Sequence, residues 1–591
     1  MSAINDSEND EEKNQPLAED SLALIQKKTS WKIKCLYVLT IGGVLLIVCF
    51  VAFIVIFNGK KDKNKITTKE DKEEPEEDDT ETYTYMNLTH YLTAKYQRNR
   101  PLNEWEDPGD EIVTLFNEKY LDSISSIIVN ETTVKGSNQY KSEYGEFSVT
   151  IEFNRTLKST DQMFKDCFNL KEVDFSKFIT ENLTNMAEMF SGCTSLISLN
   201  LTNFDTSKVK NMSYLFSGCS LINNISIYNF NTSKVLDMKY MFDGCAKITS
   251  LIINNFDTHR LKEIKYMFNG CLKLVDLEVG KDFVINGIKD LSGLFSDCLY
   301  LTKINISNID TSKTLNMSNM FNNCMKLTSI DLSKYDTSKV VDMSGMFYNC
   351  FELTSIDLSN FDTSNVEDMH DLFRTCSLIK ELNLKNFKTS KVKNMKSMFS
   401  YCTNLESLDL SNFKTSQVTN MKEMFSFCSS LKNLDLSKFD TSKVTDMSFM
   451  FSATFKLTSI DLQSFNTKNV VNLKNMFYND KELKSIDLSS FNTINVENID
   501  NMFFGCQALT ELNLNNFDTS KVTTMTGIFS ECTNLTYLDI SKFSSKSLNG
   551  ENNLLFIGKM TNGTLKYNSK LFDKTLIEEN FEFWELEDLN S

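Results

Sequence analysis

The chain has few of the residues from which catalytic and metal-binding sites are usually built. Its 591 residues include three histidines, His90, His259 and His370, and no pair of cysteines is spaced as CxxC. The sequence also contains no Gly-rich phosphate loop and no nucleophile motif. We therefore expect no enzymatic activity, no zinc site and no cofactor.

Two further shortages exclude whole classes of protein. The 4 prolines and 19 glycines are too few for a collagen-like chain or a Pro/Gly-rich low-complexity chain. Positively charged residues are also fewer than negatively charged ones, and the formal net charge is -17. An acidic surface repels a phosphate backbone. We expect no nucleic acid among the partners.

The first feature that is present is an uncharged apolar run, Cys35–Phe57. In a helix its 23 residues extend about 34 Å, which is enough to cross a bilayer. The run is too long for a cleaved signal peptide, and 34 residues precede it. It therefore predicts a retained transmembrane helix and an integral membrane protein with a single span.

The orientation of this span is predicted from features on its two sides. Lysines flank the run on both sides, so the positive-inside rule does not decide. Twelve N-x-[ST] sequons follow the run and one, at Asn5, precedes it, and "DSLALI" (Asp20–Ile25) resembles an acidic dileucine sorting signal. We predict a type II protein of the plasma membrane, with residues 1–34 as an acidic cytoplasmic tail and the C-terminal part extracellular or lumenal. The candidate glycosylation sites are Asn87, Asn130, Asn154, Asn182, Asn211, Asn316, Asn534 and Asn562.

The rest of the chain divides into four segments. Residues 58–82 carry mixed and then acidic charge without apolar periodicity, so we expect a disordered stalk. Apolar periodicity returns in 83–157, where Glu146–Phe153 alternates as a half-buried strand does, and we predict an N-terminal capping domain there. Repeats fill 158–548, and 549–591 is expected to form a C-terminal cap.

Cysteine sets the period of the repeats. From Cys167 to Cys532 one slot recurs every 26 residues, with one extra residue before Cys298, and thirteen of its fifteen occupants are cysteine. Thr454 and Asp480 fill the other two slots. Repetition at this period predicts a stack of similar coils, each of which buries the apolar strip of its neighbour.

One unit, Cys350–Thr375, reads "CFELTSIDLSNFDTSNVEDMHDLFRT" and has apolar residues in two rhythms. Ile356 and Leu358 are spaced as in a short strand. The apolar residues of Val366–Phe373 recur every three or four positions, as on a short helix, with Thr363 and Ser364 as its caps. We predict an α/β repeat solenoid of about fifteen units in which strands pair side by side.

Two rows of large apolar residues follow from the same period. One row holds fifteen phenylalanines from Phe164 to Phe529, and the other runs from Phe178 to Phe543 with Ile309 and Tyr335 in place of two phenylalanines. We expect both rows to form continuous spines in the core.

The unit "LTSIDLSNFDTSNVEDM" followed by "MF..C" resembles the BspA-type leucine-rich repeats, in the 26-residue version of a mycoplasma-type domain of unknown function. The resemblance covers about two thirds of the chain. It implies a right-handed, leucine-rich-repeat-like extracellular coil, often linked with adhesion to host or matrix proteins, and no enzymatic activity. It transfers no site residues, because the shared positions are structural, and the N-terminal span departs from the lipid-anchored bacterial members.

The cysteine row has two interpretations. Neighbouring coils about 5 Å apart would bring cysteines within disulfide range, but thirteen residues in register do not pair evenly and two coils lack cysteine. We favour buried thiols that pack as small hydrophobic groups.

The outward side of the predicted strands carries a row of Asp and Asn residues flanked by serines. Like charges on neighbouring strands repel, so we expect this row to attract cations or a basic or hydroxyl-rich ligand. A solvated polar face and a calcium-stabilised ladder remain alternatives. The candidate ligand-binding residues are Asp331, Asp357, Asp409, Asp435, Asp461 and Asp487.

Two functions are compatible with these features. The first is a membrane-anchored surface protein whose solenoid recognises or adheres to a protein or glycan partner without catalysis. The second is a structural or shielding coat protein without a specific ligand.

Overall fold

The computed structural model describes residues 90–97, 111–142, 145–304, 306, 308–548 and 562–590. The predicted tail, transmembrane helix and stalk, together with Asn87, lie outside these residues. Within the described part, no helix has both the length and the apolar character needed to cross a membrane.

The first described elements form an antiparallel sheet that leads into the repeats. The sheet has the order β4-β3-β6-β1-β7, and β2 pairs with β5 separately. The strand predicted at Glu146–Phe153 is confirmed as β6, and β7 already belongs to the first coil. The elements are β1 (Tyr91–Gln97), β2 (Glu111–Thr114), the 3-10 helix η1 (Glu118–Ser123), β3 (Ile124–Val129), β4 (Thr132–Val134), β5 (Gln139–Ser142), β6 (Glu146–Phe153) and β7 (Leu170–Asp174).

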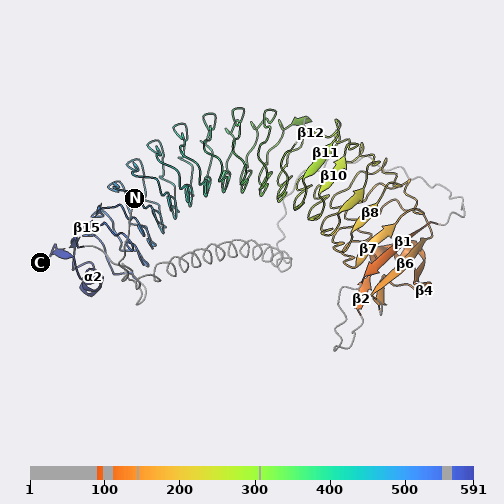
Figure 1. Ribbon diagram of the computed structural model, residues 1–591, viewed down its shortest axis with the longest axis horizontal. Helices are drawn as coiled ribbons and strands as arrows, with labels where there is room; N and C mark the ends of the chain where they lie inside the picture. The colour runs from red at the N-terminus through yellow and green to blue at the C-terminus, as the bar shows by residue number, and fades with distance from the viewer. Residues whose placement is uncertain are drawn as a thin grey trace, which may run out of the picture. The chain divides into compact units, whose positions relative to one another are not determined.

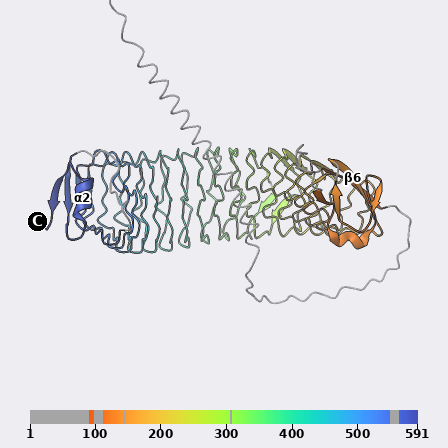
Figure 2. The same ribbon diagram turned by 90° about the horizontal axis from the view of Figure 1, so that it is seen from below.

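The repeats stack as a curved solenoid (Figures 1 and 2). Isolated parallel bridges between equivalent residues of neighbouring coils run from Ser159 to Glu263 and from Asp290 to Thr524, over about fourteen turns. The remaining elements are β8 (Ser198–Asn200), β9 (Asn224–Ser226), β10 (Ser250–Ile253), β11 (Asp276–Val279), β12 (Val284–Asn286), β13 (Asn308–Asp310), β14 (Glu511–Asn513), β15 (Tyr537–Asp539), β16 (Thr564–Tyr567), α2 (Lys574–Asn580) and β17 (Glu585–Asp588).

The helical return that we predicted for each unit is wrong. Residues 366–376 form overlapping turns instead, in which N–H groups bond to carbonyls three residues back, as Leu372 does to Met369 at 3.3 Å. Asp371 and Thr375 have φ values of 55° and 62°, which an α-helix cannot contain. These turns point side chains inward every three or four residues, so their apolar spacing imitates that of a helix. The described part is therefore a β-solenoid and not an α/β fold.

The same run supplies most hydrogen bonds between coils. In the Cys376 coil the N–H groups of Met369, Asp371, Phe373 and Thr375 each donate to a carbonyl of the next coil, at 2.7 to 3.1 Å. From Met369 to Thr375, the N–H group of every second residue thus donates to the next coil along the chain. The predicted caps do not occur, because Thr363 is buried and bonds to the next coil.

The predicted continuous ladder of strands is also wrong. Among the described residues no strand is assigned between β13 and β14, although Leu358 and its equivalents are buried as expected. The coils fan apart along the outer edge of the arc (Figure 1). Alternation over three residues predicts which side chains point inward, but it does not determine whether neighbouring backbones approach closely enough to pair.

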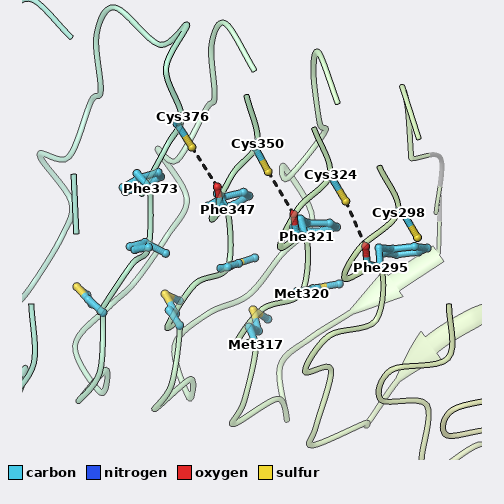
Figure 3. Packing of buried hydrophobic residues seen from close by; sticks show 14 of the residues in the cluster. Phe295, Cys298, Met317, Met320, Phe321, Cys324, Phe347, Cys350, Phe373 and Cys376 are labelled. Carbon is cyan, nitrogen blue, oxygen red and sulfur yellow. Dashed lines mark hydrogen bonds between the residues drawn. The ribbon is translucent and has the colours of Figure 1, made fainter. Parts of the chain in front are cut away.

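Both predicted spines are confirmed. The distances between their rings show how far apart neighbouring coils lie at each spine. Phe164 to Phe529 are buried and stack with ring centroids 5.4 to 6.1 Å apart, and Figure 3 shows part of this row beside the cysteines. In the second spine the stacked pairs lie farther apart, at 6.2 to 6.5 Å. The coils are thus closer at the first spine than at the second.

A row of buried threonines joins the coils at the corner that reads "FDTS", "FKTS" or "FNTK". The Thr415 hydroxyl accepts the N–H of Asp440 at 2.8 Å and donates to the Asp440 carbonyl at 2.9 Å, so one hydroxyl satisfies two backbone groups of the next coil. The same pair of bonds recurs at Thr363, Thr389, Thr441 and Thr467. The recurrent threonine is therefore a connector between coils.

In each coil we call the overlapping turns equivalent to residues 366–376 the turn run. The N-terminal elements cover the turn run of the first coil, which has no preceding coil beside it. In the first coil the carbonyls of Asp161 and Met163 have no preceding coil to bond. The hydroxyl of Tyr120 donates to Asp161 at 2.8 Å and the N–H of Asn117 donates to Met163 at 2.8 Å. Lys119 adds an ion pair to the Asp161 carboxylate at 2.6 Å.

Replacing Thr415 with valine should destabilise the solenoid, because the variant keeps the shape but leaves a backbone N–H and a carbonyl without partners. We expect a loss of about 1–3 kcal/mol in the free energy of unfolding and faster hydrogen exchange at the Asp440 amide. The control is Thr445→Val, since Thr445 is exposed and makes one long bond of 3.3 Å. Equal exchange at Asp440 in both variants would contradict the connector role.

Candidate binding face

The candidate ligand-binding residues share one exposed face of the coils. Each follows a position whose side chain points inward and precedes a buried leucine, such as Leu332 after Asp331 and Leu358 after Asp357. The predicted exposure is therefore confirmed. Because the strands of these coils are not paired, a ladder of strands does not set the spacing of the carboxylates. The exposed residues are Asp331, Asp357, Asp409, Asp435, Asp461 and Asp487.

A local bond fixes each of these carboxylates. One oxygen accepts the backbone N–H of the residue two positions later, at 2.9 or 3.0 Å in all six cases. This Asx turn is typical of Asp before a chain reversal. It fixes the position of each carboxylate on the exposed surface of its coil.

The same bonds keep the face negatively charged. Hydrogen bonds from the side chain and the backbone N–H of the following serine lower the pKa of Asp331, Asp357 and Asp409. The backbone bond, followed by the side-chain bond, lowers the pKa of Asp435 and Asp487. A carboxyl with a lowered pKa stays ionised to lower pH, so the face can attract cationic groups in neutral and mildly acidic media.

The interpretation of the cysteines as buried thiols is confirmed. All thirteen are free and buried. From Cys193 onward each thiol donates to the carbonyl of a spine phenylalanine of the preceding coil, at 3.0 to 3.3 Å (Figure 3). Burial raises the pKa of thiols such as Cys350 and Cys376, so they are neutral and poorly nucleophilic. In the described residues no group of His, Cys, Asp or Glu is placed to bind a metal ion.

The two cysteine-free slots form a buried polar pair. One carboxylate oxygen of Asp480 accepts the backbone N–H of Thr454 at 2.8 Å and its hydroxyl at 2.9 Å. The other oxygen is buried and has no hydrogen-bond partner within the described part of the chain. Desolvation raises the pKa of Asp480 well above its usual range, against the opposing effect of the two Thr454 bonds. The next thiol of the row, Cys506, lies in the following coil and is also buried.

The structure separates the candidate glycosylation sites into two groups. Asn130, Asn154, Asn182, Asn534 and Asn562 are exposed. Asn211 and Asn316 are half-buried in the row of bridges between coils, and each accepts the N–H of a serine two residues later. A glycan on either of these two would have to leave a position enclosed by neighbouring coils, so the exposed group is the better acceptor set.

Replacing Asp480 with cysteine should stabilise the protein, and the gain should grow with pH. The folded chain retains a proton on Asp480 that the unfolded chain releases above about pH 4. Wild-type stability therefore falls as pH rises from about 4 toward the raised pKa, by at most about 1.4 kcal/mol per pH unit, whereas a cysteine stays neutral there.

Unfolding midpoints at pH 4 and pH 7 for the wild type and Asp480→Cys test this expectation. Asp461→Asn is the matched control, because it also removes one carboxyl but at an exposed position. A gain that does not change with pH would show that Asp480 is not protonated in the folded chain.

Comparisons with known proteins agree with the repeat. The family described as "Mycoplasma protein of unknown function, DUF285" matches residues 158–279, 273–381, 369–485 and 451–568. A leucine-rich cell surface protein from Faecalibacterium prausnitzii A2-165 is 18% identical over 64% of this chain and 81% of its own, with a TM-score of 0.30. A leucine-rich repeat protein from Eubacterium ventriosum ATCC 27560 is 15% identical over 54% of this chain and 85% of its own, with a TM-score of 0.33. A comparison with curated proteins gives no match.

The family matches follow one another from residue 158 to residue 568, which is more than half of the chain and includes every cysteine slot of the repeat. The chain therefore belongs to the DUF285 family, which confirms the resemblance to the 26-residue version of the BspA-type leucine-rich repeats.

Proposed function

We propose that this chain is a membrane-anchored surface protein whose solenoid recognises a protein or glycan partner through its acidic face, without catalysis. The observation that carries the proposal is the row of exposed carboxylates, each held at the surface by its own backbone bond. The turn itself does not require a charge, because Asn383 and Asn513 accept the same backbone N–H at equivalent positions of other coils.

The chemistry of the face favours a basic or hydroxyl-rich partner. Carboxylates with a lowered pKa attract lysine, arginine and bound cations, and they accept hydrogen bonds from sugar hydroxyls. The serines beside them, such as Ser411 and Ser437, add hydroxyl groups that can donate and accept hydrogen bonds. An extended face that offers the same groups coil after coil suits a partner that makes several weak contacts at once.

Reversing the charge of three neighbouring carboxylates should abolish partner capture. We expect the triple variant Asp409→Lys, Asp435→Lys and Asp461→Lys to lose binding of cells or matrix proteins that the wild type retains. Because the three side chains are exposed, the unfolding midpoint should change little. The matched control reverses three charges at another slot of the repeat, by substitution of the exposed Lys391, Lys443 and Lys521 with glutamate, since these lysines bond to amide oxygens and not to carboxylates.

If the triple Asp→Lys variant captured as much partner as the wild type, the proposal would be wrong. If neither the wild type nor any variant captures a partner, while deletion of the protein exposes the cell surface to antibodies or proteases, the chain is a structural or shielding coat.

The anchored topology has its own test, since the proposal needs the solenoid outside. We expect an antibody to a C-terminal epitope tag to stain intact cells, and N-glycosidase to shift the protein on gels. Replacing Asn130, Asn182 and Asn534 with glutamine should reduce the shift, whereas replacing Asn211 and Asn316 should not. Staining only after permeabilisation, without a glycosidase shift, would instead indicate an intracellular scaffold.

A further inference from the structure

Four neighbouring coils, from Cys193 to Cys271, carry apolar side chains on their surface. Ile197 and Val275 lie four residues after the cysteine of their coils, and each is 40% exposed. In the nine coils from Cys324 to Cys532 the same slot holds only threonine, lysine or glutamate. Leu221, two residues after its cysteine, is 46% exposed. The apolar surface is therefore a local feature of these coils and not a property of the repeat.

A groove of about 610 Å³ runs across these four coils. Its volume lies within the range of ligand-binding clefts. The apolar lining residues belong to the Cys193 and Cys219 coils, and the two lysines belong to the next two coils, so the groove has an apolar end and a basic end. The lining residues are Ile197, Leu221, Asn223, Lys247, Thr249 and Lys273.

The basic end has no carboxylate to balance it. Two residues after the cysteine slot, Lys326 pairs with Glu352 of the next coil at 2.5 Å, and the same pairing recurs at Lys456. Lys247 and Lys273 occupy this slot in neighbouring coils, are exposed, and form no ion pair with any residue that the structure describes. Like charges at equivalent positions repel, so this end of the groove favours an anionic group.

The segment that leads into β17 has the complementary chemistry. Phe583 is 70% exposed, more than any other large apolar side chain in the described part of the chain. Glu582 and Glu585 on either side of it are exposed and form no ion pair among the described residues. β17 lies at the edge of its sheet, after β16. The segment thus presents one aromatic ring between two unbalanced carboxylates.

We propose that the groove binds the Phe583 segment of a second copy of this chain. The phenyl ring would lie at the apolar end of the groove, and the Glu582 and Glu585 carboxylates at the basic end. The segment of the same copy cannot reach the groove, because the ten slots from Cys298 to Cys532 separate the two by about 50 Å along the stack.

This contact is heterologous, since it joins two different surfaces. Each copy keeps one groove and one segment free after it binds, so the association can continue from copy to copy. The proposal goes beyond the proposed function, because it does not use the acidic face.

Sedimentation velocity of the full-length chain in a mild detergent, at rising protein concentration, tests the contact. We expect the sedimentation coefficient of the wild type to rise with concentration. The double variants Lys247→Glu with Lys273→Glu, and Glu582→Lys with Glu585→Lys, should remain monomeric. All four side chains are exposed, so folding should be unaffected, and each variant tests one side of the contact independently of the other.

Mixing the two double variants distinguishes this contact from other kinds of association. Neither associates alone, but equal amounts of both should associate, because the acidic segment of one meets the lysines of the other. Lys391→Glu with Lys443→Glu is the matched control, since it reverses two exposed charges elsewhere and should behave as the wild type does.

A wild type that stays monomeric, or association that both double variants retain, would overturn the proposal. Loss of association in the triple Asp→Lys variant of the acidic face would also overturn it, because the lysines would then meet that face. The acidic face is unchanged in both double variants, so partner capture and self-association are separate results.

Discussion

The structure depends on hydrogen bonding between coils along the run of turns. A single unit cannot bury its apolar strip, and its turns leave every second N–H pointing out of the coil. Both requirements are met only by a neighbour, which supplies the carbonyls and covers the strip. The first spine, the thiol bonds and the bridges all lie on or beside this run, and the coils are closest there. The threonine hydroxyls provide a second attachment at the corner, where the coils are already farther apart. The strand side can therefore open without loss of the stack, and the polar residues on it remain exposed.

The parts of this fold that could be predicted from the sequence are those that depend on the side of the coil to which a residue points. The cysteine slot, both spines, the burial of Leu358 and the exposure of Asp409 follow from the period alone. The backbone conformation could not be predicted in this way, because inward residues recur every three or four positions in a helix and in these turns. A signal was present, since glycine fills the slot before the cysteine at Gly192, Gly218, Gly244 and Gly270, and all four have positive φ.

The candidate sites show the same division. Asp480 could be placed in the core because it occupies a cysteine slot, but its unpaired oxygen depends on where Thr454 directs its two bonds. The break in the second spine at Ile309 and Tyr335 is visible in the sequence, but the absence of assigned strands in the described residues between β13 and β14 is not.

The direction of the bonds in the turn run has an electrical consequence. Each peptide unit carries a dipole of about 3.5 D, and at four alternate positions of the run, Met369 to Thr375 in the Cys376 coil, the N–H groups point toward the C-terminal end of the stack. Their dipoles add over successive turns, so the N-terminal end of the run carries partial negative charge and the C-terminal end partial positive charge. This polarity is opposite to that of an α-helix. The donors of Tyr120 and Asn117 and the ammonium group of Lys119 meet the negative end, so the N-terminal elements neutralise a pole as well as cover a core.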